Sequence, residues 1–169
     1  GKKLGDTELL DTMIRDGLWD AFHDYHMGVT AENVAEKFQI TRDEQDKFAL
    51  KSQKKALTAQ KENKFKEEII NFKIKSKKSE INFNKDEHPR EGINLETLSR
   101  LKPVFKKDGT VTAGNASGIN DGAAAVAIMS GEEAKKRNID KLVSIKSWAS
   151  CGVDPALMGT GPIPSSKKA

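Results

Sequence analysis

Two histidines, one cysteine and one arginine are the side chains of this sequence best suited to chemistry. His23 and His26 stand three residues apart, so a helix would place both imidazoles on one face, where they could bind a metal ion. No carboxylate pair at ligand spacing accompanies them. We therefore predict no metal site and interpret both as buried histidines that are hydrogen-bonded within the fold.

Cys151 is the only cysteine, which excludes an intrachain disulfide and a multi-cysteine metal site. A nucleophilic thiol needs a base within reach, and no histidine or basic residue is adjacent to Cys151 in the sequence. We interpret it as a small buried core residue and predict no catalytic residue in this chain. A lone cysteine also fits a reducing compartment, so we expect a cytoplasmic protein.

Arg90 lies in a charged loop at residues 87–91, beside the fixed kink of Pro89. Its planar guanidinium suits a phosphate group or the face of a purine. Composition alone favours a simpler interpretation, a solvated surface turn.

Residues 110–125 hold three glycines, five alanines and two asparagines. Such small side chains let a backbone or a thin ligand approach closely, and they allow tight turns. The spacing of Gly114 and Gly118 matches neither the P-loop nor the dinucleotide fingerprint, so we reject a phosphate loop. A neighbouring strand and a long, thin ligand both remain open as the partner of this run.

Composition narrows the class of protein. The chain has 169 residues, room for about one domain, with 36% hydrophobic and 32% charged residues. It contains no apolar run of membrane-spanning length and no signal-peptide pattern, and both ends look like the interior of a longer protein. The net charge of +4 is thinly spread and aromatics are 6%, so we predict no nucleic-acid face, while an anionic small molecule remains open.

The first part of the chain is predicted to be mainly helical. An apolar stripe predicts a helix over residues 6–16 that ends at Gly17. Thr30 is the expected N-cap of a helix over 31–38. Thr41, with Glu44 three residues later, forms a capping box and opens a mostly solvated helix from residue 42 to about 62.

Alternating and continuous apolar patterns follow. Residues 68–75 and 81–83 alternate, with a polar turn at 75–79, and predict either a hairpin or two strands joined by a flexible loop. A short helix is predicted over 95–101, stopped by Pro103. Residues 123–129 predict a strand buried on both faces, and 142–149 a further strand.

Between these two strands, Ser130 and Glu133 form a capping box for a helix over 132–138. The strand, helix, strand order indicates an α/β protein. The last residues, 161–169, look like a helix that has just begun.

Several motifs together resemble one enzyme family. They are YHMGVTAENVA (25–35), TRDEQD (41–46), DEHPR (86–90), LKPVF (101–105), GTVTAGNASGINDGAAA (109–125), SWA (147–149), GVDP (152–155) and MGTGP (158–162). In this order and spacing they resemble the thiolases, in particular the acetyl-CoA acetyltransferases, across essentially the whole chain.

The resemblance implies a fold and an activity. Thiolases condense two acetyl-CoA molecules reversibly to acetoacetyl-CoA and free CoA, a Claisen reaction of fatty acid metabolism. CoA is then substrate and product, with no permanently bound cofactor, and the enzyme is expected to be a homotetramer. The fold is layered α/β: residues 1–119 would be a loop domain that covers CoA, 120–141 the last strand and helix of the N-terminal half, and 142–169 the start of the C-terminal half.

The same resemblance implies a set of CoA contacts in this segment. Ser117 would hydrogen-bond a pantetheine amide, Ala113 and Phe105 would line the channel, and Arg90 would lie by the adenine nucleotide. His26 and Met27 would flank the inner channel, with Leu18 and Met158 near the acyl end.

The family's catalytic groups are not among these residues. Its nucleophilic cysteine would lie before Gly1, and its catalytic histidine and acid/base cysteine after Ala169. We therefore expect this segment to be inactive alone. The alternative is a non-catalytic module with only interaction or CoA-binding capacity.

Overall fold

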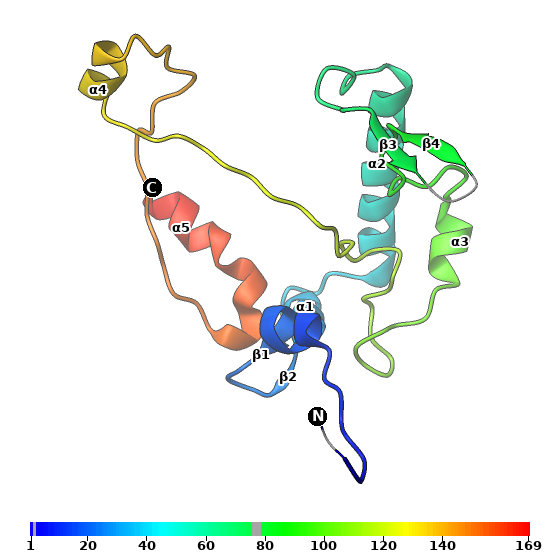
Figure 1. The fold of residues 1–169 in the computed structure, drawn as a ribbon. Helices are drawn as coiled ribbons and strands as arrows, with labels where there is room; N and C mark the ends of the chain where they lie inside the picture. The colour runs from blue at the N-terminus through cyan, green and yellow to red at the C-terminus, as the bar shows by residue number, and fades with distance from the viewer. Residues whose placement is uncertain (2, 76–78) are drawn as a thin grey trace. The chain divides into compact units, whose positions relative to one another are not determined.

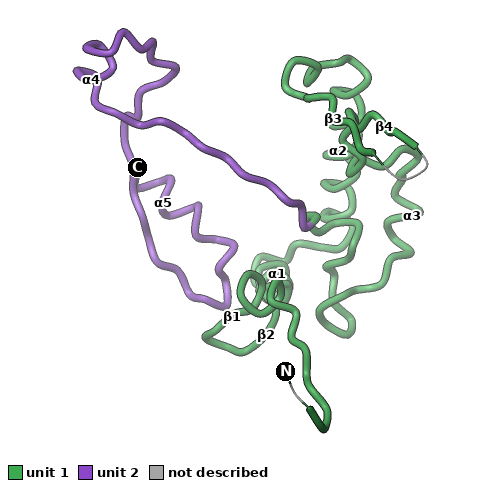
Figure 2. The backbone as a smooth tube through the Cα atoms, viewed as in Figure 1, with its two compact units in different colours: residues 1–118 green, residues 119–169 purple. Residues whose placement is uncertain are grey.

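The computed structural model describes residues 1, 3–75 and 79–169. The chain divides into two compact units, residues 1–118 and 119–169, which Figure 2 colours separately. No helix in these ranges is long and apolar enough to cross a membrane.

Unit 1 begins with a short irregular region. A π-helix, η1 (Met13–Leu18), leads into β1 (Trp19–Asp20), which pairs antiparallel with β2 (Tyr25–His26). The predicted helix over 6–16 is wrong: residues 6–11 are not helical, and Gly17 lies inside η1. Leu9 is 91% exposed, so the apolar stripe has nothing to pack against, and a short helix is not stable without such packing.

Helix α1 (Met27–Lys37) starts earlier than predicted. Its N-cap is His26, whose Nδ1 accepts a hydrogen bond from Gly28 N at 3.0 Å. Thr30, the predicted cap, lies inside the helix and donates from Oγ1 to Met27 O at 2.6 Å. The prediction was wrong because an imidazole nitrogen can accept the capping bond as a hydroxyl oxygen does.

Helix α2 (Arg42–Lys61) confirms its predicted capping box. Thr41 N donates to Glu44 Oε2 at 2.8 Å, and Glu44 N donates to Thr41 Oγ1 at 3.3 Å. The helix is largely solvated, as expected, and Asp46 is its buried residue.

The predicted hairpin is confirmed in β3 (Phe72–Lys75) and β4 (Glu80–Phe83), although β3 begins later than predicted (Figure 1). The strands are antiparallel, and Phe72 lies opposite Phe83. Part of the predicted turn, residues 76–78, lies outside the described residues. Helix α3 (Leu95–Ser99) follows, capped by Asn94, and it contacts α2.

Unit 2 contains three short helical elements. Helix α4 (Gly131–Lys136) is capped by Ser130, whose Oγ accepts from Glu133 N at 3.1 Å, so this half of the predicted box is confirmed. A 3-10 helix, η2 (Pro155–Thr160), precedes α5 (Pro162–Lys168), the predicted terminal helix.

The two predicted strands of unit 2 do not form. Residues 123–129 and 142–149 have no strand assignment, and among the described residues no strand pairs with either. Val126 is 82% exposed and Leu142 97%, so the predicted burial on both faces is wrong. A strand needs a neighbour that accepts and donates its ladder hydrogen bonds, and nothing described here supplies one.

The core of unit 1 is small and unusually polar. Leu98 is 1% exposed and Val111 8%, while Thr112 is 0%, Asp46 3% and Glu32 4% exposed. Buried polar groups need hydrogen-bond partners, and here hydrogen bonds connect residues 110–115 to α1 and to α2.

Candidate functional site

A cavity of about 320 Å³ in unit 1 brings together two stretches that the sequence singled out. Its lining includes Arg90 with its loop and the small residues Ala113, Gly114 and Ala116. The remaining lining residues are Gln53, His88, Glu91, Gly92, Ile93, Thr97, Leu98 and Leu101. The cavity therefore combines a guanidinium group with a stretch of small side chains.

The loop that carries Arg90 is attached to α2 by hydrogen bonds to its backbone. Arg90 N donates to Gln53 Oε1 at 2.9 Å, and Gln60 Nε2 donates to Asp86 O at 2.8 Å. The Arg90 side chain is exposed and, within the described ranges, makes no hydrogen bond or ion pair of its own. Glu91, which also lines the cavity, is 3.4 Å from Lys85 Nζ. The backbone is held while the guanidinium stays available for an anion.

The space around Gly114 shows which residues pack against this part of the small-residue run. A Cβ added there would lie 2.5 Å from Leu98 Cδ2 and 2.5 Å from Leu101 Cδ1. The close neighbours at this position are thus Leu98 of α3 and Leu101, which follows it, and neither belongs to a strand. The cavity opens beside the same residue, so backbone packing and room for a ligand occur together.

Two of the predicted site residues, His26 and Met27, form the junction of β2 and α1, and a third, Phe105, packs against His26, whereas Leu18 is the last residue of η1. The rings of His26 and Phe105 stack with centroids 4.7 Å apart, and Met27 and Leu18 are half-buried. A Cβ on Gly28 would lie 2.4 Å from the Phe105 ring, so only glycine lets the ring sit there. Because His26 Nδ1 accepts from Gly28 N, a neutral His26 carries its proton on Nε2 and can donate from it.

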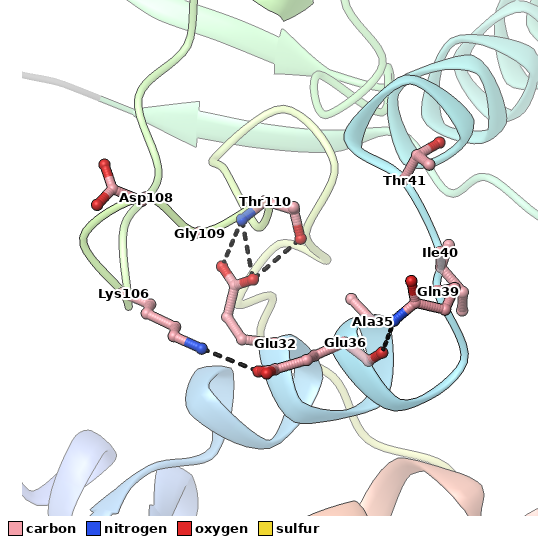
Figure 3. Close-up of a pocket in the computed structure, with 10 residues that line it drawn as sticks. All are labelled: Glu32, Ala35, Glu36, Gln39, Ile40, Thr41, Lys106, Asp108, Gly109 and Thr110. Atoms are coloured by element: carbon pink, nitrogen blue, oxygen red, sulfur yellow. Dashed lines mark hydrogen bonds and ion pairs between the residues drawn. The ribbon is translucent and has the colours of Figure 1, made fainter.

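A second cavity of about 300 Å³ lies between α1 and residues 106–110 (Figure 3). Its lining residues are Glu32, Ala35, Glu36, Gln39, Ile40, Thr41, Lys106, Asp108, Gly109 and Thr110. Glu32 points to the Thr110 backbone and hydroxyl, and Lys106 Nζ lies 3.0 Å from Glu36 Oε2. These three charged side chains already have partners, so this cavity lacks the free cation of the first.

Comparison with known proteins identifies the family. The chain matches the family "Thiolase, N-terminal domain" over residues 1–132. It is 57% identical over 169 residues to an acetyl-CoA acetyltransferase of Rhizobium meliloti and 59% to one of Paracoccus denitrificans, covering 100% of this chain and 43% of each relative. The chain belongs to the thiolase family. It spans less than half the length of these relatives.

Solved thiolase structures confirm the predicted fold class. The Bacillus anthracis acetyl-CoA acetyltransferase superposes with a TM-score of 0.86 at 46% identity, covering 99% of this chain and 42% of that one. Human mitochondrial 3-ketoacyl-CoA thiolase gives 0.86 at 44% identity, covering 100% and 43%. The chain is therefore a thiolase-like α/β segment.

Two further predicted site residues of this thiolase segment, Ser117 and Met158, are not among the residues that line the Arg90 cavity. Ser117 is exposed at the end of unit 1, and no hydrogen bond of its hydroxyl occurs within the described ranges. Met158 lies in η2 of unit 2 and is 43% exposed. Their membership of one site with Arg90 stays a prediction.

The two histidines and the cysteine are less buried than expected. His23 Nδ1 bonds Asp20 Oδ2 at 2.8 Å, so the hydrogen-bonded interpretation is confirmed, but its side chain is 42% exposed. Desolvation raises the pKa of Asp20, yet hydrogen bonds from Phe22 N and His23 hold that pKa, on balance, below its usual value. Cys151 is half-buried, and its backbone N donates to Ser165 Oγ at 3.1 Å.

Sequence reasoning missed Glu32 and Asp46. Glu32 shares the buried stripe of α1 with Gly28 and Ala35, at helical spacings of four and three residues. An acidic residue on the stripe that packs inward was the available signal, because a buried carboxylate requires partners.

Proposed function

We propose that this chain is the CoA-binding segment of an acetyl-CoA C-acetyltransferase. The intact enzyme would condense two acetyl-CoA molecules reversibly to acetoacetyl-CoA plus CoA. The relatives of this name, 57% and 59% identical over the whole chain, support the proposal. Residues 1–119 would cover CoA, 120–141 would complete the N-terminal half, and 142–169 would open the C-terminal half.

The observation that carries the proposal is the cavity bordered by Arg90 and Ala113. CoA pairs a phosphorylated adenine nucleotide with a long, thin pantetheine arm. A guanidinium can bind phosphate oxygens bidentately or stack on the adenine. Small side chains at residues 113–116 allow the thin arm to lie against the backbone. In this proposal Ser117 supplies a hydroxyl to a pantetheine amide.

The inner end of the channel would be formed by the stacked pair His26 and Phe105 with Met27. Their aromatic and thioether surfaces suit an aliphatic arm, and His26 Nε2 offers one donor to a carbonyl or thiolate. Leu18 and Met158 would lie near the acyl group. CoA is substrate and product here, so no permanently bound cofactor is required.

This segment would position CoA without performing the covalent step. Cys151 is half-buried, and it is its backbone N, not its thiol, that donates to Ser165 Oγ. We expect no thiolysis of acetoacetyl-CoA by the isolated chain. Turnover by the isolated chain that vanished in Cys151→Ala would overturn this part of the proposal.

Calorimetric titration of the full-length protein with CoA tests the site. Arg90→Ala should weaken CoA binding by about tenfold, the scale of one charge-assisted hydrogen bond. Arg100→Ala is the matched control, because Arg100 is also exposed but pairs with Glu96. Equal effects of the two variants would remove Arg90 from the site.

Two further expectations accompany the proposal. We expect a homotetramer in the cytoplasm, which sedimentation analysis and cell fractionation would check. The alternative function is a non-catalytic CoA-binding module. Binding of CoA by a full-length protein that shows no condensation or thiolysis would favour that alternative.

A further inference from the structure

Residues 110–115 are held by two buried carboxylates from two different helices. Glu32 of α1 is 4% exposed and Asp46 of α2 is 3% exposed. We infer that Glu32 is a positioning residue for the CoA site: it holds the start of this loop so that Ala113 and Ser117 are already placed for pantetheine. The identity of the ligand rests on the proposed function. The hydrogen bonds that Glu32 and Asp46 accept from residues 110–115, which we call the clamp, do not depend on it.

Glu32 accepts hydrogen bonds from the first two residues of the loop, Thr110 and Val111, and Figure 3 shows those from Thr110. Thr110 N donates to Oε1 at 2.9 Å and to Oε2 at 2.8 Å, and Val111 N donates to Oε1 at 2.8 Å. Thr110 Oγ1 donates to Oε2 at 2.9 Å. Both side-chain oxygens of Glu32 accept, whereas an amide at this position would turn its NH2 group toward these donors.

Gly109 lets the loop close on that carboxylate. A Cβ at this position would lie 2.3 Å from Glu32 Oε1. The close contact is therefore part of the clamp, because a larger residue would push the loop away from its acceptor.

Asp46 holds the far end of the same loop through Asn115. Asn115 Nδ2 donates to Asp46 Oδ1 at 3.0 Å and to Thr110 O at 3.0 Å, while Thr112 N donates to Asn115 Oδ1 at 2.8 Å. Arg42 Nε pairs with Asp46 Oδ2 at 2.8 Å and balances its charge. The loop is thus tied at residues 110–111 to α1 and at residue 115 to α2.

This arrangement favours positioning over simple cohesion. Buried charges are poor general stabilisers, because desolvation offsets much of their attraction. Here the donors to Glu32 are two backbone N–H groups and one hydroxyl of the loop itself, and among the described residues no buried side-chain nitrogen or oxygen lacks a partner. A loop already in its binding shape spares CoA the free energy of ordering it.

The test compares Glu32→Gln with Glu36→Gln in the full-length protein. Glu36 lies one turn away on the same helix, is exposed and pairs with Lys106. In Glu32→Gln, amide exchange at Thr110 and Val111 should accelerate by about tenfold or more. If the competent loop population falls to about a tenth, KM for CoA in thiolysis rises about tenfold while kcat changes less than about twofold. Glu36→Gln should leave the amide exchange rates, KM for CoA and kcat unchanged.

Each other outcome decides a distinct point. Unchanged exchange and unchanged KM in a folded Glu32→Gln protein overturn the inference, and so does a lower kcat at unchanged KM, which marks a merely structural role. If Glu32→Gln does not fold, Thr110→Val removes one bond of the clamp, and an unchanged KM there overturns it as well. A wild-type protein that binds no CoA refutes the proposed function, whereas the exchange measurement still tests the clamp.

Discussion

Gly114→Ala is the substitution whose consequence the structure defines most closely. The added methyl would lie 2.5 Å from both Leu98 Cδ2 and Leu101 Cδ1, about 1 Å inside ordinary van der Waals contact. Leu98 is 1% exposed, so its side chain has little room to withdraw. The φ angle of Gly114 is not in the left-handed region, so the penalty comes from packing and not from backbone strain.

We expect a loss of about 1–3 kcal/mol in the free energy of unfolding, the usual penalty for an extra carbon in a packed site. For a protein of this size, each kcal/mol corresponds to a fall in Tm of about 2–4 °C. Leu98→Ala alone should cost about 2–5 kcal/mol by leaving a cavity. The double variant should cost less than the sum of the two, because the new methyl fills part of that cavity.

Urea unfolding of the four proteins, followed by circular dichroism, measures this cycle. Gly122→Ala is the control from the same small-residue run, because nothing lies within 4 Å of its Cβ position. The reasoning is refuted if Gly114→Ala is as mild as Gly122→Ala. Strict additivity of Gly114→Ala and Leu98→Ala would also refute it.

Further predictions concern single features of the fold. The backbone N–H and hydroxyl of Thr41 hold the pKa of Glu44 below its usual value, so its stabilising effect is present above the usual carboxyl pKa and is lost as pH falls through the lowered one. Unfolding titrations of wild type and Glu44→Gln should therefore converge toward low pH, and a pH-independent difference would contradict this. Gly92 has φ of +77° with nothing within 4 Å, so Gly92→Ala should cost about 1 kcal/mol in denaturant unfolding and Gly92→Asn less. Cys151→Ser in the full-length protein should leave thiolysis unchanged, and a large loss of kcat would show that this thiol takes part.

Elements that depend on neighbours in sequence were predictable. The Thr41–Glu44 box joins residues three positions apart, and the alternation at residues 72–75 and 80–83 matches the observed hairpin. The start of α1 was misplaced only because the residue that caps it, His26, is not a usual cap. Fold class and family followed from motifs spread over the whole chain.

Elements that depend on distant partners were not predictable from local pattern. The apolar residues 123–129 favour a buried strand, but a strand exists only when another strand supplies its hydrogen bonds. Within the described residues nothing does, and the segment stays extended and exposed.

The small-residue run shows the division most clearly. Its composition indicated that another part of the chain or a ligand approaches the backbone closely. The spacing of its glycines excluded a phosphate loop. Only the tertiary structure decided that Leu98 and Leu101 pack against Gly114 and that Arg90 faces the same cavity. Glu32 and Thr110 are 78 positions apart, so the local pattern of α1 can mark Glu32 as a buried acid but cannot indicate that Thr110 is its partner. Local hydrogen bonds and periodicity depend on residues close in sequence and can be predicted from it. The burial that requires a carboxylate to have hydrogen-bond donors arises only when the chain folds.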